Sequence, residues 1–313
     1  MKVSIIIPTK NRWHLLKETL ANILNQSLTP YEVIVVDDGS TDKTEEGIKF
    51  GFKDKVIYTH NGGKGPGAAR NTGMEIATGD YIKFFDSDDL MTRNTLEAQV
   101  KAFQNNHNTF IYSSYFQAKS KDGMWETMDD TILQYYPFPD SQPLNYWMCR
   151  GLFLPIPGML FKKELLKDTG KWRTDITAYE DFDYLWRLSL MVPYPKHIND
   201  CAFLYRTHGR QITEHDFTHE QRDKDKVLIF EKIIDSYFPD YLNSNDLKTL
   251  YLKIAFLPNQ NRRNFNKYDL YILKKKNQLK DKIGRLNTKS SWQPFTGPYQ
   301  SKSKIEDYMK KIL

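Results

Sequence analysis

The 313-residue sequence is poor in cysteine and contains no long apolar run. Its two cysteines, Cys149 and Cys201, are too few for a disulfide framework, which predicts a reducing compartment. No uninterrupted apolar segment approaches the roughly 20 residues that a membrane-spanning helix needs. The apolar run at residues 3–7 is too short to be the core of a signal peptide. These absences together predict a cytoplasmic protein.

Charged residues are unevenly distributed along the chain. From residue 241 to the C-terminus there are 16 Lys and Arg against 5 Asp and Glu, a net charge of 16 − 5 = +11. The whole chain carries +6, so the first 240 residues carry 6 − 11 = −5. A basic segment of this kind suits anionic lipid at the inner face of the cell membrane, or a polyanionic acceptor. Solvated helix faces are the alternative, and without any RNA- or DNA-binding signature we expect no nucleic acid partner.

The first ninety residues alternate between strand and helix patterns. Apolar runs predict buried parallel strands, and apolar positions at helical spacing predict the helices between them. The expected strands are 3–7, 32–36, 56–59 and 81–85, and the expected helices are 15–24, 41–49 and 68–77. This order predicts an α/β fold with a mainly parallel central sheet flanked by helices. Ligands of such sheets bind at the carboxyl ends of the strands.

The most informative polar segment is Asp86-Ser87-Asp88, which follows the apolar run 81–85. Two carboxylates at the end of a buried strand repel each other, and a hard divalent cation that carries a diphosphate would offset that repulsion. A turn or a helix N-cap is the alternative for this tripeptide alone. We expect Asp88 to be the better metal ligand and Asp89 to cap the helix that carries Leu96.

Four motifs follow one another in the first ninety residues: I-I-I-P-T-x-N-R, V-I-V-V-D-D-G-S-T-D, G-A-A-R-N-T-G and F-F-D-S-D-D. In this order they resemble the N-terminal half of family 2 glycosyltransferases of the GT-A fold. A fifth segment, residues 179–188, resembles the E-D motif that begins a helix in the acceptor half of that family. The resemblance implies a GT-A catalytic domain at 1–213, with a nucleotide-sugar-binding half at 1–105 and an acceptor half at 106–213. We expect residues 214–313 to form a basic, mainly helical region that contacts a membrane or pairs subunits in a homo-oligomer.

The resemblance assigns the first two motifs to the nucleoside of the donor. Pro8 and Thr9 turn the chain off the first strand, so that backbone groups meet the base and ribose. Asp38 is the expected partner of the base, because a carboxylate accepts the imide N–H of uracil. Asn61 is expected at the edge of the base or ribose, whereas Asp37 is expected to hold the turn.

The resemblance assigns the next residues to the diphosphate and a metal ion. Arg70, near the start of a helix, is expected to face the diphosphate, and a surface ion pair is its alternative. Asp86 and Asp88, with Ser87 between them, are expected to bind the ribose and Mn²⁺ or Mg²⁺. His208 in a Y-R-x-H segment is expected at the metal or diphosphate, although a single histidine is equally a structural residue.

Inverting sugar transfer requires a base for the acceptor hydroxyl and positive charge for the leaving diphosphate. By resemblance the base is Asp181, and Glu180 orients acceptor or donor hydroxyls. Acidic residues in a first helical turn also favour the helix dipole without any catalytic role. The expected donor is a UDP-hexose or UDP-N-acetylhexosamine, and the expected acceptor is a hydroxyl of a glycan or lipid-linked glycan.

Three other functions are compatible with an α/β sheet. The glycine-rich segment 62–67 lacks the G-x-G-x-x-G order of dinucleotide-binding enzymes, so we expect flexibility over the donor phosphates to explain its glycines. A nucleotidyltransferase would need a Gly-rich, Arg- and Lys-bearing loop after the first strand, where P-T-K-N-R stands instead. A sugar-nucleotide-binding protein without transfer activity remains open.

Overall fold

The computed structural model describes residues 1–104, 109–121, 124–132, 140–149, 152, 154–176, 178–208, 225 and 228–229. The N-terminal elements are β1 (Val3–Thr9), α1 (Trp13–Leu24), β2 (Glu32–Asp37), α2 (Thr44–Gly51), η1 (Lys53–Lys55), β3 (Ile57–His60), α3 (Gly65–Ile76), β4 (Tyr81–Phe84), β5 (Leu90–Met91) and α4 (Thr95–Phe103). The later elements are β6 (Ile111–Lys121), β7 (Met124–Ile132), α5 (Leu144–Cys149), η2 (Ile156–Gly158), β8 (Met159–Lys162), α6 (Lys163–Thr169), α7 (Glu180–Met191) and β9 (Lys196–Thr207). The expected α/β fold is confirmed, with helix ends shifted by a few residues.

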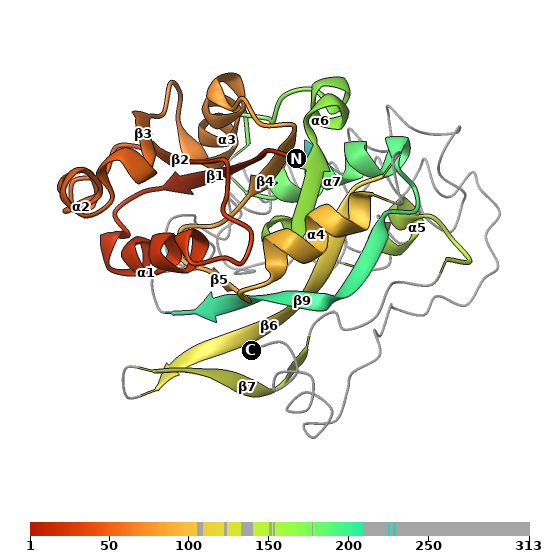
Figure 1. Cartoon of the computed structure of the whole chain (residues 1–313). Coiled ribbons are helices and arrows are strands. Elements are labelled where there is room, and N and C mark those ends of the chain that lie inside the picture. The colour runs from red at the N-terminus through yellow and green to blue at the C-terminus, as the bar shows by residue number, and fades with distance from the viewer. Residues whose placement is uncertain are drawn as a thin grey trace, which may run out of the picture.

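The strands form one sheet in the order β3-β2-β1-β4-β8-β6-β9-β5, with β7 paired to β6 (Figure 1). The pairs of the N-terminal half, β1–β2, β2–β3 and β1–β4, are parallel as expected. The second half mixes one parallel pair, β6–β9, with antiparallel pairs β4–β8, β6–β8 and β5–β9. The strand order reverses between β1 and β4, and this reversal is where a ligand crevice opens in such sheets.

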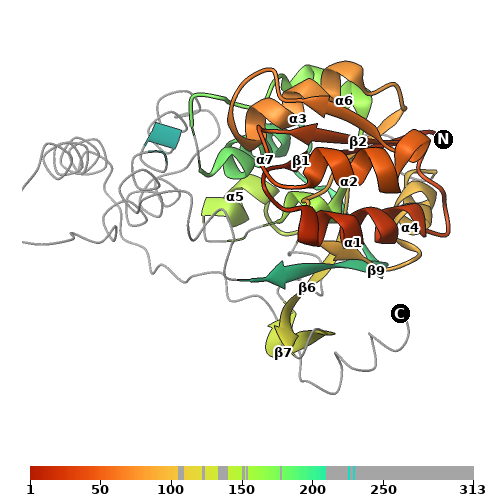
Figure 2. The same cartoon turned by 90° about the vertical axis from the view of Figure 1, so that its left-hand side faces the viewer.

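Helices cover both faces of the sheet because its buried strands are apolar on both sides (Figure 2). Alternate residues of β1 illustrate this: Ile5 and Ile7 belong to one buried cluster and Ile6 to the other. The cluster with Ile5 includes residues of α1, α2 and α4, and α1 and α2 lie in front of the sheet in Figure 2. The cluster with Ile6 includes residues of α3, α5, α6 and α7.

The last two glycines of the glycine-rich segment belong to a helix and not to the flexible loop that we expected over the donor phosphates. Gly65 and Gly67 lie in the first turn of α3. A Cβ on Gly67 would lie 2.4 Å from the carbonyl oxygen of Arg173, so a close backbone approach requires glycine there. Gly65 has a φ of 83°, which also favours glycine. These two glycines therefore set how α3 begins and docks.

Lys83 is fully buried in β4, three residues before Asp86 and five before Asp88. Its Nζ donates to Gln99 Oε1 at 3.1 Å, to the Pro157 carbonyl at 2.7 Å and to the Met159 carbonyl at 3.2 Å. Three acceptors match the three N–H groups of an ammonium ion. Lys83 thereby ties β4 to the η2–β8 segment beneath the carboxylate turn.

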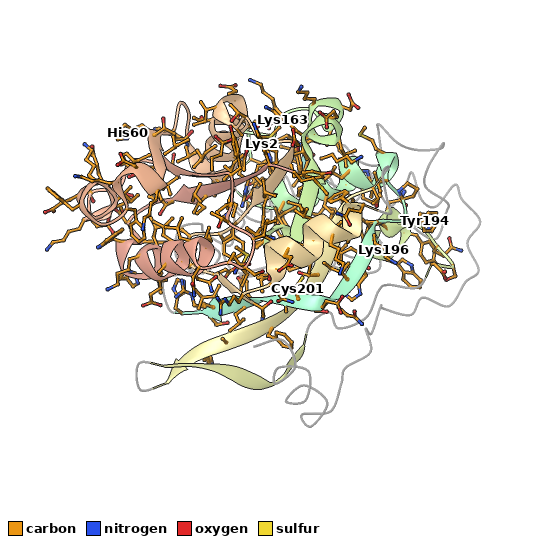
Figure 3. All side chains as sticks on the ribbon, in the orientation of Figure 1. Lys2, His60, Lys163, Tyr194, Lys196 and Cys201 are labelled. Atoms are coloured by element: carbon orange, nitrogen blue, oxygen red, sulfur yellow. The ribbon has the colours of Figure 1, made fainter. Side chains whose placement is uncertain are left out.

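Cys201 is a buried thiol on β9, which packs against α4 (Figure 3). Burial raises the pKa of this thiol to about 12, so it is not a nucleophile at neutral pH.

Among the described residues, no helix has both the length and the apolar character to cross a bilayer. Of the expected C-terminal region, 214–313, only residues 225, 228 and 229 are described, and its helical content lies outside the described residues.

Candidate functional site

Three carboxylates gather in the turn that follows β4. Asp88 and Asp89 are 8% and 0% exposed, whereas the Asp86 side chain keeps 31% of its surface exposed. Burial and the charges of Asp88 and Asp86 raise the pKa of Asp89 well above its usual value, and burial raises the pKa of Asp86. The turn thus places three carboxyl groups close enough to influence one another, and each ionised one needs a cation or a hydrogen-bond donor beside it.

Asp89 does not cap α4, contrary to the expectation from sequence. Helix α4 begins at Thr95, and the cap residue Asn94 makes no side-chain cap hydrogen bond. The Asp89 carboxylate instead accepts the backbone N–H of Arg206 at 3.0 Å. Asp89 therefore joins the carboxylate turn to β9.

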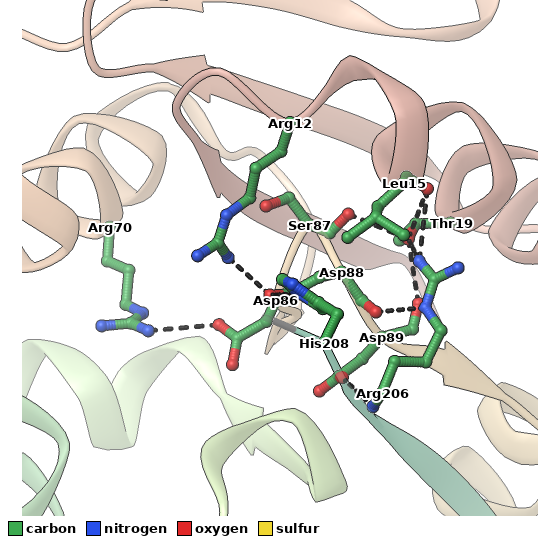
Figure 4. A network of polar contacts seen from close by, with 10 residues as sticks. All are labelled: Arg12, Leu15, Thr19, Arg70, Asp86, Ser87, Asp88, Asp89, Arg206 and His208. Carbon is green, nitrogen blue, oxygen red and sulfur yellow. Dashed lines mark hydrogen bonds and ion pairs between the residues drawn. The ribbon is translucent and has the colours of Figure 1, made fainter. Parts of the chain in front are cut away.

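Two basic side chains meet at one oxygen of Asp88 (Figure 4). Arg12 Nη1 lies 2.5 Å from Asp88 Oδ2, and His208 Nε2 lies 3.0 Å from the same atom. Burial alone would raise the pKa of Asp88, but the hydrogen bond from His208 and the charge of Arg12 lower it below the usual value. His208 thus lies beside the expected metal carboxylate, and Arg12 is a site residue that the sequence analysis missed. Its only signal was the final position of the P-T-K-N-R segment after β1.

Arg206 fastens the backbone of the carboxylate turn to α1. Its fully buried guanidinium donates to the Asp88 carbonyl, to Glu18 Oε2 at 2.7 Å and to Thr19 Oγ1 at 2.8 Å. The Thr19 hydroxyl in turn lies 3.0 Å from the Ser87 carbonyl oxygen. Arg206 was also missed, although it stands in the Y-R-x-H segment. Its network holds Ser87 by the main chain, and the Ser87 side chain is 2% exposed.

Arg70 connects the two halves of the site. Its Nη1 lies 2.9 Å from Glu180 Oε1, and its Nη2 lies 3.3 Å from Asp86 Oδ1. The side chain is 6% exposed, so the bridge is buried and the alternative of a surface pair is wrong. Burial would lower the pKa of Arg70, but the two carboxylates raise it, so this guanidinium is a fixed positive charge.

The Trp172 ring packs against the Arg70 guanidinium, a contact that the sequence did not predict. The Arg70 guanidinium carbon lies 4.5 Å from the centre of the Trp172 ring, which stacks on Tyr184 with centroids 4.0 Å apart. Asn71 exchanges two hydrogen bonds with the Trp172 backbone, at 2.8 and 2.9 Å. Trp172, in the segment before α7, therefore contacts two successive residues of α3, Arg70 and Asn71.

Glu180 and Asp181 begin α7, as the E-D motif predicts. The Asp181 carboxylate accepts the N–H of Phe182 at 2.7 Å. Burial and the charge of Glu180 raise the pKa of Asp181 to about 7, with Arg70 acting in the opposite direction. A carboxylate with this pKa can take up a proton in the neutral range.

Asp37 and Asp38 lie at the carboxyl end of β2. Asp37 accepts the Ser40 N–H and the Tyr58 hydroxyl, both at 2.7 Å, and holds the turn as expected. Asp38 Oδ1 accepts Asn61 Nδ2 at 2.6 Å and the Gly65 N–H at 3.1 Å. Its Oδ2 lies 3.6 Å from the exposed Lys10 ammonium. Asp38 and Asn61 are therefore neighbours, as the resemblance implied.

Pro8 and Thr9 do not turn the chain off the first strand as expected: both belong to β1 and pair with Val36 and Asp37 of β2, so Thr9 is the last residue of the strand. Its carbonyl accepts the Asp38 N–H at 2.9 Å. Its hydroxyl is buried without a hydrogen-bond partner among the described residues. A buried hydroxyl of this kind at the switch point is available to a polar ligand.

The donor atoms of the turn fit a divalent ion that is shared with a phosphate. Among the described residues, no group of three or more His, Cys, Asp and Glu side chains is arranged to hold a metal by itself. Asp86, Asp88 and His208 nevertheless supply carboxylate oxygens and an imidazole nitrogen at one turn. Mg²⁺ and Mn²⁺ commonly take one or two carboxylates and complete their coordination with phosphate and water.

Comparison with known proteins agrees with this geometry. The family model described as glycosyl transferase family 2 matches residues 4–170. An uncharacterized glycosyltransferase of Rickettsia bellii is 40% identical over 139 residues, which are 44% of this chain but only 20% of that protein. Glycosyltransferase GlyG of Streptococcus pneumoniae is 27% identical over 242 residues, covering 74% of this chain and 79% of GlyG. The chain thus spans about a fifth of one relative and most of another.

Solved structures share the fold. TarS of S. aureus in complex with UDP-GlcNAc aligns with a TM-score of 0.68 at 21% identity, covering 91% of this chain and 84% of the TarS chain. The mannosyltransferase PcManGT of Pyrobaculum calidifontis, with GDP-Man and Mn²⁺, aligns with a TM-score of 0.55 at 20% identity, covering 92% of this chain and 76% of the other. The family model, the ordered motifs and the fold agree, and the chain belongs to glycosyl transferase family 2.

Proposed function

We propose that this protein transfers a sugar from a nucleotide-sugar donor to a hydroxyl group, with inversion at the anomeric carbon. The observation that carries the proposal is the Arg70 bridge between Asp86 and Glu180. It brings the carboxylate turn after β4 next to the acidic first turn of α7. A donor diphosphate and an acceptor hydroxyl would therefore meet between the Arg70 guanidinium and Asp181, whose pKa is about 7.

Asp181 is the proposed base. Its pKa of about 7 matches a group that takes a proton from the acceptor hydroxyl as the oxygen attacks the sugar. Glu180 is held by Arg70, which suits a role in orienting hydroxyl groups. Arg70 is proposed to stabilise the charge that develops on the leaving diphosphate, because its own charge is buried and fixed.

The proposed donor is a UDP-hexose or UDP-N-acetylhexosamine, bound by Pro8, Thr9, Asp38 and Asn61. The carboxylate of Asp38 is oriented by two hydrogen bonds to Oδ1, and its Oδ2, 3.6 Å from the exposed Lys10 ammonium, would accept an imide N–H. The TarS structure contains UDP-GlcNAc, which supports this donor class. The relative WfgD of Escherichia coli, 35% identical over 36% of this chain and 45% of its own, is named as a UDP-Glc-dependent glucosyltransferase.

We propose Mn²⁺ or Mg²⁺ as the cofactor, held by Asp88 and Asp86 with His208 beside them. The ion would supply positive charge to the donor diphosphate. The carboxylate and imidazole groups gathered at the turn and the Mn²⁺ in the PcManGT structure support this assignment.

The domain boundaries and the acceptor are also proposals. Residues 1–105 would bind the donor and residues 106–213 the acceptor, a hydroxyl of a glycan or lipid-linked glycan. WfgD is named for an acceptor on diphosphoundecaprenol, which supports the lipid-linked class. The basic region 214–313 would contact anionic lipid, with subunit pairing as its alternative. Failure of the protein to float with anionic liposomes at low salt would contradict the membrane contact.

Asp181→Asn tests the proposed base. We expect the variant to bind UDP normally and to lose transfer activity by about 10²- to 10⁴-fold. Asp168→Asn, an exposed position on α6, is the matched control and should keep full activity. Transfer by Asp181→Asn at near-normal rates would remove Asp181 from the role of base.

Hydrolysis assays with Mn²⁺ and a panel of sugar nucleotides both identify the donor and distinguish the transferase from its alternatives. Hydrolysis of one UDP-sugar supports the transferase. UDP binding without turnover of any donor supports a sugar-nucleotide-binding protein instead. Formation of a sugar nucleotide from a sugar phosphate and UTP supports a nucleotidyltransferase.

A further inference from the structure

The residue before the acidic pair has a backbone that few tyrosines adopt. Tyr179 has φ 61° and ψ 19°, in the left-handed region that favours glycine. The chain turns at this residue into α7, and the Tyr179 carbonyl accepts the N–H of Asp183 in the first helical turn. The conformation of Tyr179 therefore determines where the helix begins and where Glu180 and Asp181 lie. A strained residue of this kind persists only where its surroundings hold it.

The residue that holds this turn comes from beyond the expected catalytic domain. Asp225 Oδ2 accepts the backbone N–H of Ala178 at 2.9 Å, across 47 positions of sequence. Asp225 is 3% exposed, so the hydrogen bond to its carboxylate is shielded from water. Ala178 immediately precedes Tyr179, so the bond fixes the peptide that enters the left-handed residue.

The same part of the chain contributes an apolar side chain to the core. Ile229, four residues after Asp225, is 1% exposed. It belongs to the buried cluster that includes Phe182 and Tyr184, which follow the acidic pair on α7. Asp225 is thus anchored by its neighbourhood and not only by its own hydrogen bond.

We propose that Asp225 is a positioning residue for the acidic pair. By holding the Ala178 N–H, it keeps Tyr179 in the left-handed conformation and so places Asp181 and Glu180 at the reaction centre. The inference rests on the proposed function of Asp181 as base, and it extends the catalytic unit past residue 213. Asp225 itself touches neither donor nor acceptor in this proposal.

The first test separates chemistry from donor binding. In the full-length protein, Asp225→Ala removes the acceptor of the Ala178 N–H, and we expect kcat for transfer to fall by about 10- to 100-fold. The Kd for UDP should change less than about threefold, because Asp38 and the contacts of Arg70 with Asp86 and Trp172 do not involve this turn. Asp225→Asn keeps an oxygen acceptor and should give an intermediate kcat. An unchanged kcat in Asp225→Ala would overturn the proposal.

A double-mutant cycle separates positioning from general stabilisation. Tyr179→Gly removes the Cβ penalty of the left-handed conformation, so the turn needs Asp225 less. We expect Asp225→Ala, or Asp225→Asn where the alanine variant does not fold, to lose less than about threefold in kcat in the Tyr179→Gly background. Equal losses in both backgrounds would show that Asp225 only stabilises the fold.

These results are distinguishable from a failure of the proposed function. If Asp181→Asn transfers sugar normally, Asp181 is not the base and the premise of the inference falls. If Asp181→Asn is inactive while Asp225→Ala keeps full kcat, the base stands and only the positioning role of Asp225 is wrong.

Discussion

Arg12 and Asp88 form a buried ion pair, with Nη1 2.5 Å from Oδ2, although 76 positions separate them in sequence. Arg12 follows β1 and Asp88 follows β4, the two strands between which the order of the sheet reverses. Both side chains are about one tenth exposed. The pair therefore lies at the reversal of strand order, where the donor diphosphate is proposed to bind, and it occupies an oxygen of the proposed metal ligand Asp88.

Removing the Arg12 charge should strengthen metal binding and weaken the metal-free fold. In Arg12→Gln, Mn²⁺ no longer competes with the ion pair, so we expect about tenfold tighter binding, or about 1.4 kcal/mol. The unfolding free energy without metal should fall by about 3 kcal/mol, because a buried charge loses a partner. Electron paramagnetic resonance titration of Mn²⁺ and urea denaturation measure the two effects.

Arg93→Gln is the matched control for this prediction, because Arg93 is exposed. It should leave both Mn²⁺ affinity and stability within experimental error. Weaker Mn²⁺ binding by Arg12→Gln would contradict the competition and would indicate that Arg12 assists the metal or the phosphate.

Transfer activity should rise with pH through the neutral range. Asp181 must be ionised to accept a proton, and its pKa of about 7 leaves about one tenth ionised one pH unit below that value and about nine tenths one unit above. Glu180→Gln removes a neighbouring negative charge, which should lower the pKa and move the acidic limb of kcat/KM to lower pH. A pH–rate profile of the wild type and of Glu180→Gln checks the shift. An acidic limb that does not move would contradict the influence of the Glu180 charge on the pKa of Asp181.

The packing of α3 should tolerate no side chain at Gly67. Gly67→Ala places a Cβ 2.4 Å from the Arg173 carbonyl, so the helix and its Arg70 must shift. We expect a loss of about 1–3 kcal/mol in unfolding free energy and weaker UDP binding. Gly51→Ala at the end of α2 meets nothing within 4 Å and should be neutral or slightly stabilising. Equal stability of the two variants would contradict the close contact.

Trp172 should matter for donor binding although it is buried beneath Arg70. Trp172→Leu removes the ring under the guanidinium and the stack with Tyr184, so we expect a loss of about 3 kcal/mol in stability. UDP affinity should fall by about five- to tenfold, because a cation–π contact contributes about 1 kcal/mol or more. Trp172→Phe keeps an aromatic face and should retain most of the affinity, which calorimetric titration of UDP can measure. Equal UDP affinity in Trp172→Leu and the wild type would exclude support of Arg70.

The sequence predicted the strands of the N-terminal half and the polar residues that stand at their carboxyl ends. Asp37 holds its turn, and Asp38 lies beside Asn61, because both follow directly from where parallel strands end. It did not predict Arg12 or Arg206 at the carboxylate turn, because a basic residue after a strand has many possible partners. The sequence did not predict Trp172 either, because its contact with Arg70 depends on how α3 packs against a segment that lies 172 − 70 = 102 positions further along the chain.

The prediction for Asp89 was wrong for a similar reason. A local rule assigned it to the following helix, but strand β5 lies between Asp89 and α4, which begins only at Thr95, and the Asp89 carboxylate accepts the buried N–H of Arg206 instead.

The sequence by itself determined the alternation of apolar runs, the family and the chemical types of the residues at the strand ends. Those features depend on local periodicity and on which side chains stand next to a strand. Only the tertiary structure decided which charges are paired: Arg12 with Asp88, and Arg70 between Asp86 and Glu180. Pairing depends on the burial of each charge and on its distance from partners in other elements, and neither quantity is local in sequence.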